Sequence, residues 1–600
     1  MGDVCQPVSG HTGCFLGSGA SRLRRFKRGD SLTWRRKVAP EGRQKVAVRR
    51  KPVRRSAPLG RFGWLQHLPQ EAAVRIVRSM PTPVRLLQSA RLISLLTLGS
   101  RVLGLVRECL FGYLFSTSQT LSAFRIAFMV PNLARRLFGE GALSAAMIPV
   151  VTRCIHEDGE DAARRLCGTV ITRLIVGLTA LVVLAEAGVA LWRWYRPDVA
   201  LSLTGILLPY MVMICVVAVA GGVLNVRNHF AVPAVAPMLL NVGVIVAAAT
   251  GAWWLGLTGD TLVRAICIGV LVAGVAQVAL MAGALKRANF FPILGGDRRS
   301  PHVRAIGKAM APMILGLSAV QINSFVDYLI AYAFVIVDGE RVGPAVLGYA
   351  QYLYQLPLGV FGIALATAIF PVLSRKSAQD DRRGVADVFT HGIRLALFVA
   401  VPASVGLALV ARPLVATLFQ RGAFDYPDTL RVASTLVFYG LGLPAYFALH
   451  LLVRTFYALG SSRTPARIAL CMVGVNLALN LALVGPLEER GLALATAISA
   501  TLQTVWLAWK LRRTLPEIEW RRIASGAARS LLAAAAMAAV LLFVLPSTPA
   551  PITGWMQALP YLAGLVATGV LTYLLVARLL RMDELHGLLR NGASSNNSSV

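Results

Sequence analysis

The chain has 600 residues and a formal charge of +33, from 61 Lys and Arg against 28 Asp and Glu, yet 56% of it is hydrophobic and its mean hydropathy is +0.63. A soluble nucleic-acid-binding protein is polar on average, and a disordered basic chain lacks hydrophobic residues, so this combination excludes both classes. The excess charge must lie between long apolar segments, which predicts an integral membrane protein with no nucleic-acid partner.

The N-terminal segment, residues 1–85, holds 19 basic and 4 acidic residues. It contains the pair Arg24-Arg25, but no apolar stretch of about 7 to 15 residues follows, so a secretory signal is not indicated. Two interpretations remain open. The segment is a basic, disordered tail attracted to anionic headgroups, or it lies upstream of the true start, for which Met80 is a candidate.

Apolar runs broken by Gly, Pro and charged residues predict fourteen membrane spans, because a span needs about 20 mostly apolar residues. The sequence therefore favours an all-α polytopic fold of about fourteen transmembrane helices. The predicted spans lie near residues 88–113, 121–151, 170–192, 203–225, 236–257, 262–284, 309–335, 345–373, 392–411, 432–457, 466–485, 490–509, 526–545 and 558–577.

The basic residues between these spans orient them, because cytoplasmic loops carry an excess of Lys and Arg. With the N-terminus inside, 29 of the basic residues after residue 85 belong to inside loops and 8 to outside loops. This asymmetry favours fourteen spans with both termini in the cytoplasm. Five basic residues remain within the first two spans, namely Arg101, Arg107, Arg125, Arg135 and Arg136.

An internal repeat relates the two halves of the chain. Residues 141–153 and 363–375 are identical at six of thirteen positions, and six spans separate the copies, so both cross the membrane in the same direction. Parallel repeats of this kind predict two six-helix lobes with a transport path between them. The predicted domains are the basic segment 1–85, an N-terminal lobe 86–290, a C-terminal lobe 300–515, two extra transmembrane helices in 525–580, and a cytoplasmic tail 581–600.

Charged residues within the first span point to a polar cavity, because an ionisable group near the bilayer centre costs roughly 2.5 to 3.5 kcal/mol on insertion scales. At about 100° per residue, Arg101 and Glu108 share a helix face with Gly104, and Arg107 lies roughly 120° away. Arg101 lies well inside the apolar run. We therefore predict that Arg101 faces the cavity, whereas Arg107 and Glu108 either do so, mark a helix end, or pair with neighbouring residues.

The second span carries a proline followed by Asn132, Arg135, Arg136 and Glu140. The proline predicts a kink beside a polar cavity. Arg136 and Glu140 are four residues apart and can neutralise each other, which leaves Arg135 as net positive charge. Since guanidinium groups match phosphate oxygens, these arginines indicate an anionic, phosphorylated substrate. Arg125 either joins them or reaches to the membrane surface.

In the seventh span Asp327 is either an interfacial carboxylate or a proton or cation site. The eight cysteines form no C-x-x-C pair, and the histidines form no H-E-x-x-H motif, so neither a disulfide framework nor a metal site is predicted. A nucleotide-binding G-x-x-x-x-G-K-[ST] loop is also missing. We expect a transporter without a cofactor, driven by a coupling ion or by membrane potential.

Four sequence motifs resemble those of the MurJ (MviN) lipid II flippases. They are dense, occur in the same order, and belong to a resemblance that runs from about residue 87 to 580. The motifs are Ser100-Arg-Val-Leu-Gly, Pro131-Asn-Leu-Ala-Arg-Arg-Leu-Phe-Gly-Glu-Gly-Ala, Tyr349-Ala-Gln-Tyr-Leu-Tyr-Gln-Leu-Pro-Leu-Gly-Val-Phe-Gly-Ile-Ala and Leu418-Phe-Gln-Arg-Gly-Ala-Phe.

The resemblance implies membership of the multidrug/oligosaccharidyl-lipid/polysaccharide exporter superfamily. It implies a multi-pass protein of the bacterial plasma (inner) membrane that flips lipid II, the undecaprenyl-pyrophosphate-linked peptidoglycan precursor, to the outer leaflet by alternating access. The two extra helices would form a groove for the lipid tail, in contact with membrane lipids. The family's essential arginines match Arg101, Arg107 and Arg135, and its span-2 glutamate matches Glu140.

Two positions depart from the family pattern. Ser122 stands where span 2 usually has an aspartate, and Tyr352 where span 8 usually has an arginine. An acid and a base are missing together, and Arg125 is a candidate to compensate. Three alternatives stay open: a flippase for another polyprenyl-pyrophosphate-linked glycan, a drug exporter of the superfamily, and a non-transporting scaffold for cell-wall synthesis proteins.

Overall fold

The structure is a computed structural model of the chain. It describes residues 83–136, 142–195, 198–227, 229–293, 300–545 and 555–585. These residues belong to one compact unit, Pro81–Val600, and the unit Met1–Met80 lies outside the described residues. The predictions for the basic N-terminal segment, for the start at Met80 and for Glu140 therefore fall outside what the structure describes.

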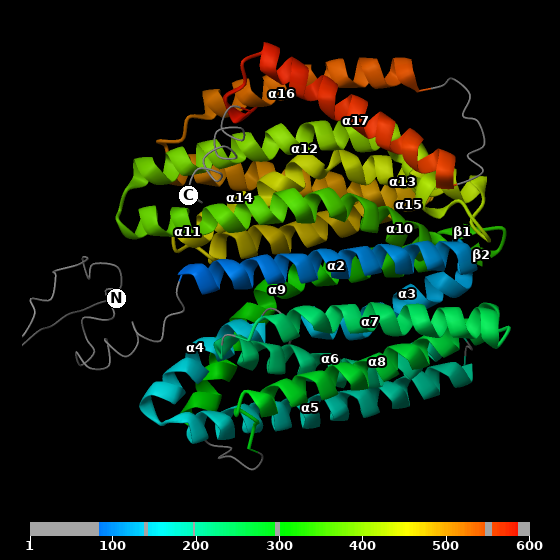
Figure 1. The fold of residues 1–600 in the computed structure, drawn as a ribbon, viewed down its shortest axis with the longest axis vertical. Coiled ribbons are helices and arrows are strands. Elements are labelled where there is room, and N and C mark those ends of the chain that lie inside the picture. Colours follow the sequence, from blue (N-terminus) through cyan, green and yellow to red (C-terminus); the bar gives the residue numbers. More distant parts are fainter. Residues whose placement is uncertain are drawn as a thin grey trace, which may run out of the picture. The chain divides into compact units, whose positions relative to one another are not determined.

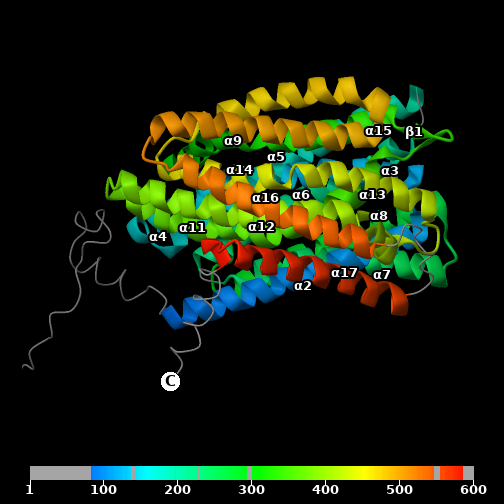
Figure 2. The same cartoon turned by 90° about the horizontal axis from the view of Figure 1, so that it is seen from above.

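The described part of the chain is built from long helices (Figures 1 and 2). In the N-terminal part they are α2 (Pro83–Phe115), α3 (Gln119–Ala134), α4 (Ala142–Glu157), α5 (Glu160–Tyr195), α6 (Val199–Val226), α7 (Ala231–Ala249) with the π-helical η3 (Thr250–Trp254), and α8 (Gly259–Arg287). They continue as α9 (Pro301–Phe334), α10 (Gly343–Pro357), the π-helical η4 (Leu358–Ile363), α11 (Ala364–Ala378), α12 (Arg382–Phe419), α13 (Tyr426–Leu441), α14 (Leu443–Ala458), α15 (Arg463–Thr514), α16 (Trp520–Val544) and α17 (Trp555–Leu579).

Twelve of the fourteen predicted spans each coincide with one helix or with consecutive helices. Span 2 corresponds to α3 and α4, span 8 to α10, η4 and α11, and span 10 to α13 and α14, which meet at an angle of 43°. Spans 11 and 12 both fall in α15, where Glu488 interrupts the helical backbone with a φ of 54°. Within the described residues, nine helices are long and apolar enough to cross a membrane, and the bent pair α13–α14 makes a tenth.

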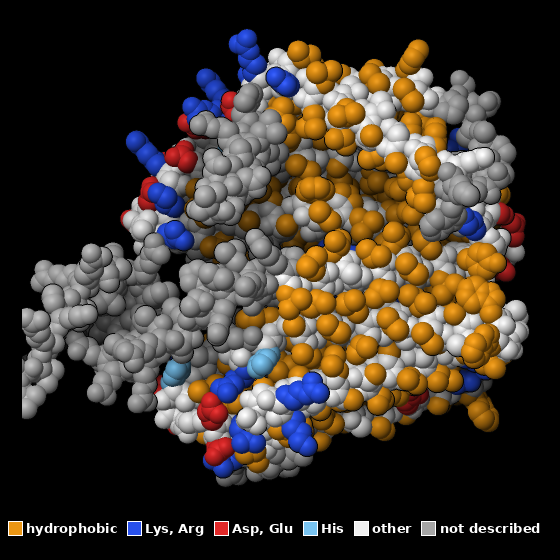
Figure 3. All heavy atoms as spheres, viewed as in Figure 1, with side chains coloured by type: hydrophobic (Ala, Val, Ile, Leu, Met, Phe, Trp, Pro, Cys, Tyr) orange, Lys and Arg blue, Asp and Glu red, His pale blue; other side chains and the backbone are white. Residues whose placement is uncertain are grey.

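These helices place apolar side chains on their outer surface as well as in the interior. Large hydrophobic side chains such as Leu184, Trp254 and Phe543 are mostly exposed. On the face in Figure 3, hydrophobic side chains cover the middle of the helices, and charged side chains gather toward the helix ends. Helices that are apolar all round suit a lipid environment, so the all-α membrane fold predicted from the sequence is confirmed.

Many of the helices that pack together are distant in the chain. Helices α3, α6, α7 and α8 pack together with α2 alongside α7, whereas α12 to α15 pack together, and α16 and α17 pack on α12 (Figure 1). Helix α9 contacts both α4 and α15. One cluster of buried apolar side chains contains residues of both predicted lobes, including Phe124 and Phe447. The division into lobes at residues 290–300 stays a prediction.

A short hairpin between α9 and α10 is not among the predicted elements. Strands β1 (Ile336–Val337) and β2 (Glu340–Arg341) are antiparallel, with Val337 opposite Glu340. Asp338 and Gly339 both have positive φ, at 52° and 83°. Such a pair is the usual two-residue hairpin turn, in which Asp-Gly is favoured. The Asp338-Gly339 dipeptide in the sequence therefore indicated a hairpin turn, although the strands on either side have only two residues each.

Candidate functional site

A cavity of about 540 Å³ lies among α2, α3, α6, α7 and α8, and α10 contributes one residue to its wall. Arg101, Arg107 and Arg135, which the sequence predicts to bind substrate, all line it, and so does Asn132. The other polar residues that line it are Ser100, Tyr210, Asn225, Asn241, Gln277 and Tyr352. None of the described lining residues is acidic. A second hollow, of about 590 Å³ at the α15–α16 connection, contains no predicted site residue.

Arg107 is held in the cavity wall by two partners. Its Nη1 donates to Oδ1 of Asn241 at 2.9 Å, and its Nη2 donates to Oε1 of Glu108 at 2.7 Å. Asn241 in turn donates to the backbone carbonyl of Ser100 at 3.2 Å. The Arg107 side chain keeps 21% of its surface exposed. It is therefore oriented by its neighbours while still able to contact a ligand.

The residues of α2 that line the cavity are not those of a single face on the helical wheel. Arg101, Gly104 and Arg107 line the cavity together, whereas Glu108 is 2% exposed and is not among the lining residues. The wheel fixes the direction of each Cβ, but a guanidinium lies several bonds further out and follows its partners. Asn241, a neutral residue on α7, carried no sequence signal for this role.

Arg135 and Arg101 are positioned differently. Arg135 donates from Nε and Nη2 to Oδ1 of Asn132, at 3.0 and 2.8 Å, so the two residues form one polar group at the end of α3. The guanidinium of Arg101 lies against Gly359 in η4, where a Cβ would overlap it. The Tyr352 hydroxyl donates to the Arg101 carbonyl at 2.6 Å. Arg101 therefore joins the cavity to helices of the predicted C-terminal lobe.

Arg125 does not line the cavity. Its Nη2 donates to Oε2 of Glu108 at 2.7 Å, opposite the oxygen that Arg107 occupies. Its Cζ lies 4.7 Å from the centre of the Tyr349 ring, and its guanidinium fills the space that a Cβ on Gly348 would need. Glu108 thus balances two arginines inside the protein. The alternative of Arg125 reaching to the membrane surface is wrong, because its side chain is only 13% exposed.

The remaining predicted residues of the first two spans also find partners. Arg136 donates to Oε1 of Gln321 on α9 at 2.6 Å, and its predicted partner Glu140 lies outside the described residues. Ser122 is fully buried, and its hydroxyl accepts from the backbone N–H of Ala345 at 3.2 Å. At this position the chain therefore uses a neutral hydroxyl to satisfy a backbone donor near the start of α10.

Asp327 lies in a buried polar cluster between α9 and α15. Asn480 donates to its Oδ1 at 2.6 Å, and the Thr496 hydroxyl lies 3.4 Å from its Oδ2. Asn480 also donates to Oδ1 of Asn476 at 2.9 Å. Asp327 is 2% exposed, so the carboxylate is enclosed by these oxygen and nitrogen atoms. The sequence singled out Asp327 but gave no sign of its three neighbours.

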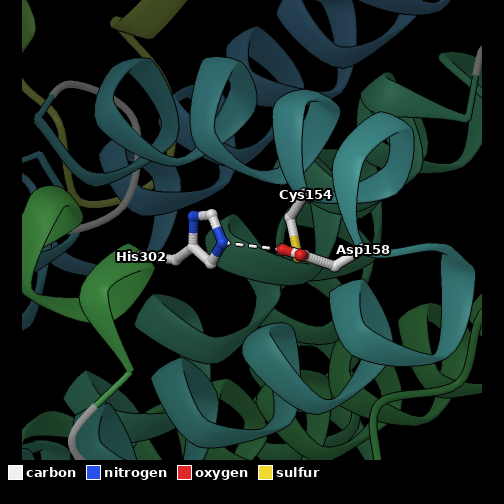
Figure 4. A group of neighbouring side chains, drawn as sticks. All are labelled: Cys154, Asp158 and His302. Carbon is white, nitrogen blue, oxygen red and sulfur yellow. Dashed lines mark hydrogen bonds and ion pairs between the residues drawn. The ribbon is translucent and has the colours of Figure 1, made fainter.

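A second grouping of titratable side chains involves Cys154, Asp158 and His302 (Figure 4). Burial raises the pKa of the Cys154 thiol, and the neighbouring Asp158 raises it further. His302 Nε2 lies 2.8 Å from Oδ2 of Asp158. The sequence gave no sign of this grouping, because helices α5 to α8 separate His302 from the other two residues.

Comparison with known proteins gives a consistent result. The sequence model of the family described as "Lipid II flippase MurJ" matches residues 111–560. The lipid II flippase MurJ of Burkholderia cenocepacia is 33% identical over 435 residues, which cover 70% of this chain and 82% of the relative. The probable lipid II flippase MurJ of Vibrio cholerae is 33% identical over 516 residues, which cover 83% and 96%.

Two solved structures share the fold. A lipid II flippase MurJ in an inward closed conformation superposes with a TM-score of 0.68 at 24% identity, covering 82% of this chain and 99% of that one. An inward-facing MATE family transporter of the MOP superfamily gives a TM-score of 0.58 at 16% identity, covering 69% and 94%. At these identities the likeness concerns the fold alone.

Proposed function

The chain belongs to the MurJ family of lipid II flippases, and we propose that it carries lipid II from the cytoplasmic to the outer leaflet of a bacterial plasma membrane for cell-wall synthesis. The four motifs predicted this family. The two relatives named above are described as a lipid II flippase and a probable lipid II flippase, and this chain matches most of the length of each. The protein is a transporter that moves its substrate by alternating access, with both termini in the cytoplasm.

The observation that carries the proposal is the charge of the cavity. Arg101, Arg107 and Arg135 are the charged residues among its described lining. Guanidinium groups bind phosphate oxygens through two parallel hydrogen bonds, and a pyrophosphate offers several such pairs of oxygens. A cavity for cationic drugs would instead need carboxylates. The charge therefore supports a pyrophosphate-linked substrate over the drug-exporter alternative.

Contacts between the lobes support an inward-facing state. Arg341 in β2 donates to Oδ2 of Asp198 at 3.0 Å, and the Tyr332 hydroxyl donates to Oδ1 of the same carboxylate at 3.0 Å. Asp428 accepts from the hydroxyl of Ser116. All these residues lie at or near predicted outside loops. Bonds at the outer end keep the lobes together there, so the headgroup would reach the arginines from the cytoplasmic side.

The enclosed carboxylate of Asp327 is our proposed coupling site. Together with Asn476, Asn480 and Thr496 it offers several oxygen ligands or proton acceptors, which suit a hard monovalent cation or a proton. The cluster joins α9 to both parts of α15, on either side of the break at Glu488. Binding of an ion there would change the packing of α9, which also contacts α4.

The test of the function is complementation of a bacterium depleted of its own lipid II flippase. The wild-type chain should restore growth, and Arg101→Ala should not, because it removes one of three charges that hold the pyrophosphate. Arg153→Ala is the matched control, since Arg153 is an exposed arginine near the end of α4. Full rescue by Arg101→Ala would overturn the assignment of Arg101.

Reconstituted protein separates the remaining alternatives. In liposomes that contain lipid II, the wild-type chain should exchange it between leaflets. Exchange of another polyprenyl-pyrophosphate-linked glycan without exchange of lipid II would reassign the substrate. No exchange of either lipid, combined with retained binding of cell-wall synthesis proteins, would establish a scaffold in place of a transporter.

A further inference from the structure

Away from the cavity, three potential metal ligands converge near the ends of α4 and α9. The Cys154 sulfur, a carboxylate oxygen of Asp158 and a ring nitrogen of His302 all lie within 4.8 Å of one another. Asp158 follows α4 directly, and its N–H donates to the Cys154 carbonyl at 2.9 Å, which continues the helical turn. The two side chains therefore lie on one helix face. In Figure 4 the Asp158 carboxylate points toward the ring of His302, which comes from the first turn of α9, and the Cys154 sulfur lies beside that carboxylate.

We propose that Cys154, Asp158 and His302 bind Zn²⁺, with water as the fourth ligand. Sulfur, nitrogen and oxygen ligands in a tetrahedral arrangement are typical of zinc, and a thiolate with an imidazole disfavours Mg²⁺ and Ca²⁺. When the Zn–S bond forms, the thiol proton is released to solvent.

The spacing of the three side chains suits this ion. Ligand atoms around tetrahedral zinc are separated by about 3.3 to 3.6 Å, as follows from bond lengths near 2.0 to 2.3 Å. The distance of 2.8 Å between Asp158 Oδ2 and His302 Nε2 would have to increase by about half an ångström. The other pairs of ligand atoms lie within 4.8 Å, so side-chain rotation can bring them to the required separation. Cys154 is 1% exposed, whereas the side chains of Asp158 and His302 are 47% and 23% exposed, so the ion can approach from solvent.

The site would act on the transport cycle, a consequence that rests on the proposed function. Cys154 and Asp158 belong to the predicted N-terminal lobe, and His302 to the predicted C-terminal lobe. All three lie at the predicted cytoplasmic ends of their helices. Bound Zn²⁺ would tie α4 to α9 and stabilise the arrangement described here, because an ion that binds one state shifts the population toward it. Zn²⁺ would therefore slow the cycle.

Binding is tested first, on the purified full-length chain without a histidine tag, with Co²⁺ as a spectroscopic probe and Zn²⁺ as competitor. Wild-type protein should show a thiolate-to-Co²⁺ charge-transfer band that Zn²⁺ abolishes. Cys154→Ser should remove the band and weaken metal binding by about 100-fold or more. Even the loss of a residue that only hydrogen-bonds to a metal ligand lowers metal affinity by about 10- to 100-fold. His302→Gln should weaken metal binding similarly, at a partly exposed position where misfolding is not expected.

Two control variants make the binding result decisive. His156→Gln changes an exposed histidine on the same helix, and Cys471→Ser changes an exposed cysteine elsewhere. Both should bind Co²⁺ like the wild type. Absence of the band in wild-type protein, or equal weakening by His156→Gln and His302→Gln, would overturn the proposed site and leave an ordinary ion pair beside a buried thiol.

A second measurement addresses the consequence for transport. Low concentrations of Zn²⁺ should reduce lipid II exchange in liposomes by several-fold for the wild type and leave Cys154→Ser unaffected. Equal inhibition of both proteins would overturn the proposed effect of Zn²⁺ on the transport cycle, even if the ion binds. A wild-type chain that binds Co²⁺ through Cys154 but exchanges no lipid would refute the proposed function while the metal site stands, so the two failures can be told apart.

Discussion

Arg125 donates to the buried carboxylate of Glu108 at 2.7 Å and thereby joins α3 to α2 inside the protein. The second oxygen of the same carboxylate holds Arg107 in the cavity wall. Arg125 also packs on Tyr349 and Gly348 of α10. The orientation of a cavity arginine is therefore linked, through one carboxylate, to the contact between α3 and α10.

Replacing the shared carboxylate should be costly. Glu108→Gln leaves the charges of Arg107 and Arg125 unbalanced within the protein, and breaking a buried pair in this way costs about 3 to 5 kcal/mol. We expect a large drop in the thermal unfolding temperature in detergent and loss of complementation. Glu157→Gln, an exposed glutamate at the end of α4, should change stability by less than about 0.5 kcal/mol. Wild-type stability of Glu108→Gln would refute this linkage.

A side chain at Gly348 should require a shift of Arg125, which is held by its hydrogen bond to Glu108. A Cβ there overlaps the Arg125 guanidinium, so Gly348→Ala should destabilise the protein by about 1 to 3 kcal/mol, although alanine usually favours a helix by about 1 kcal/mol. Gly283→Ala in α8 is the control, since no heavy atom lies within 4 Å of its added Cβ. Thermal unfolding of both variants measures the difference. If the two alanines have the same effect, Arg125 does not occupy this space.

Tyr352 allows a test of cavity charge at one position. Tyr352→Phe removes the hydrogen bond to the Arg101 carbonyl, which is worth about 0.5 to 1.5 kcal/mol, and should retain complementation. Tyr352→Glu adds a carboxylate to a cavity that contains Arg101, Arg107 and Arg135, so it should compete with the phosphates and abolish complementation. Growth supported by Tyr352→Glu would argue against an anionic substrate.

Asp327→Asn tests the coupling site. The substitution conserves size and can keep a hydrogen bond to Asn480, so the protein should fold, but it removes the charge that would bind an ion or a proton. We expect lipid II exchange in liposomes to lose its response to an imposed ion gradient. Asp387→Asn, which alters an exposed aspartate on α12, should respond like the wild type. An unchanged response in Asp327→Asn would place coupling elsewhere.

Long apolar runs made most of the fold predictable, because a membrane span has few other ways to satisfy its backbone. The same physics singled out Arg101, Arg107 and Arg135, since arginine is rare in a span unless it faces a polar space. All three line one cavity. Their roles as substrate ligands stay predictions, which the variants above address.

What the sequence could not indicate depends on contacts between distant segments. Asn241 on α7 is an ordinary polar residue until α2 brings Arg107 to it. His302 meets Asp158 only because α9 packs against α4. Composition and periodicity report which face of a helix is polar, but not which helix lies opposite, so partnerships of this kind need the three-dimensional arrangement.

Among the described lining residues of the cavity, the arginines come from α2 and the end of α3, and α10 contributes only the phenol of Tyr352. The C-terminal lobe could therefore move away from a bound pyrophosphate without breaking an ionic bond to it. A carrier of this kind would hold its cargo almost equally well whichever way it faces. The net direction of transport would then come from removal of the precursor on the outer side, or from the energy stored in an ion gradient, rather than from a difference in substrate affinity between the two states.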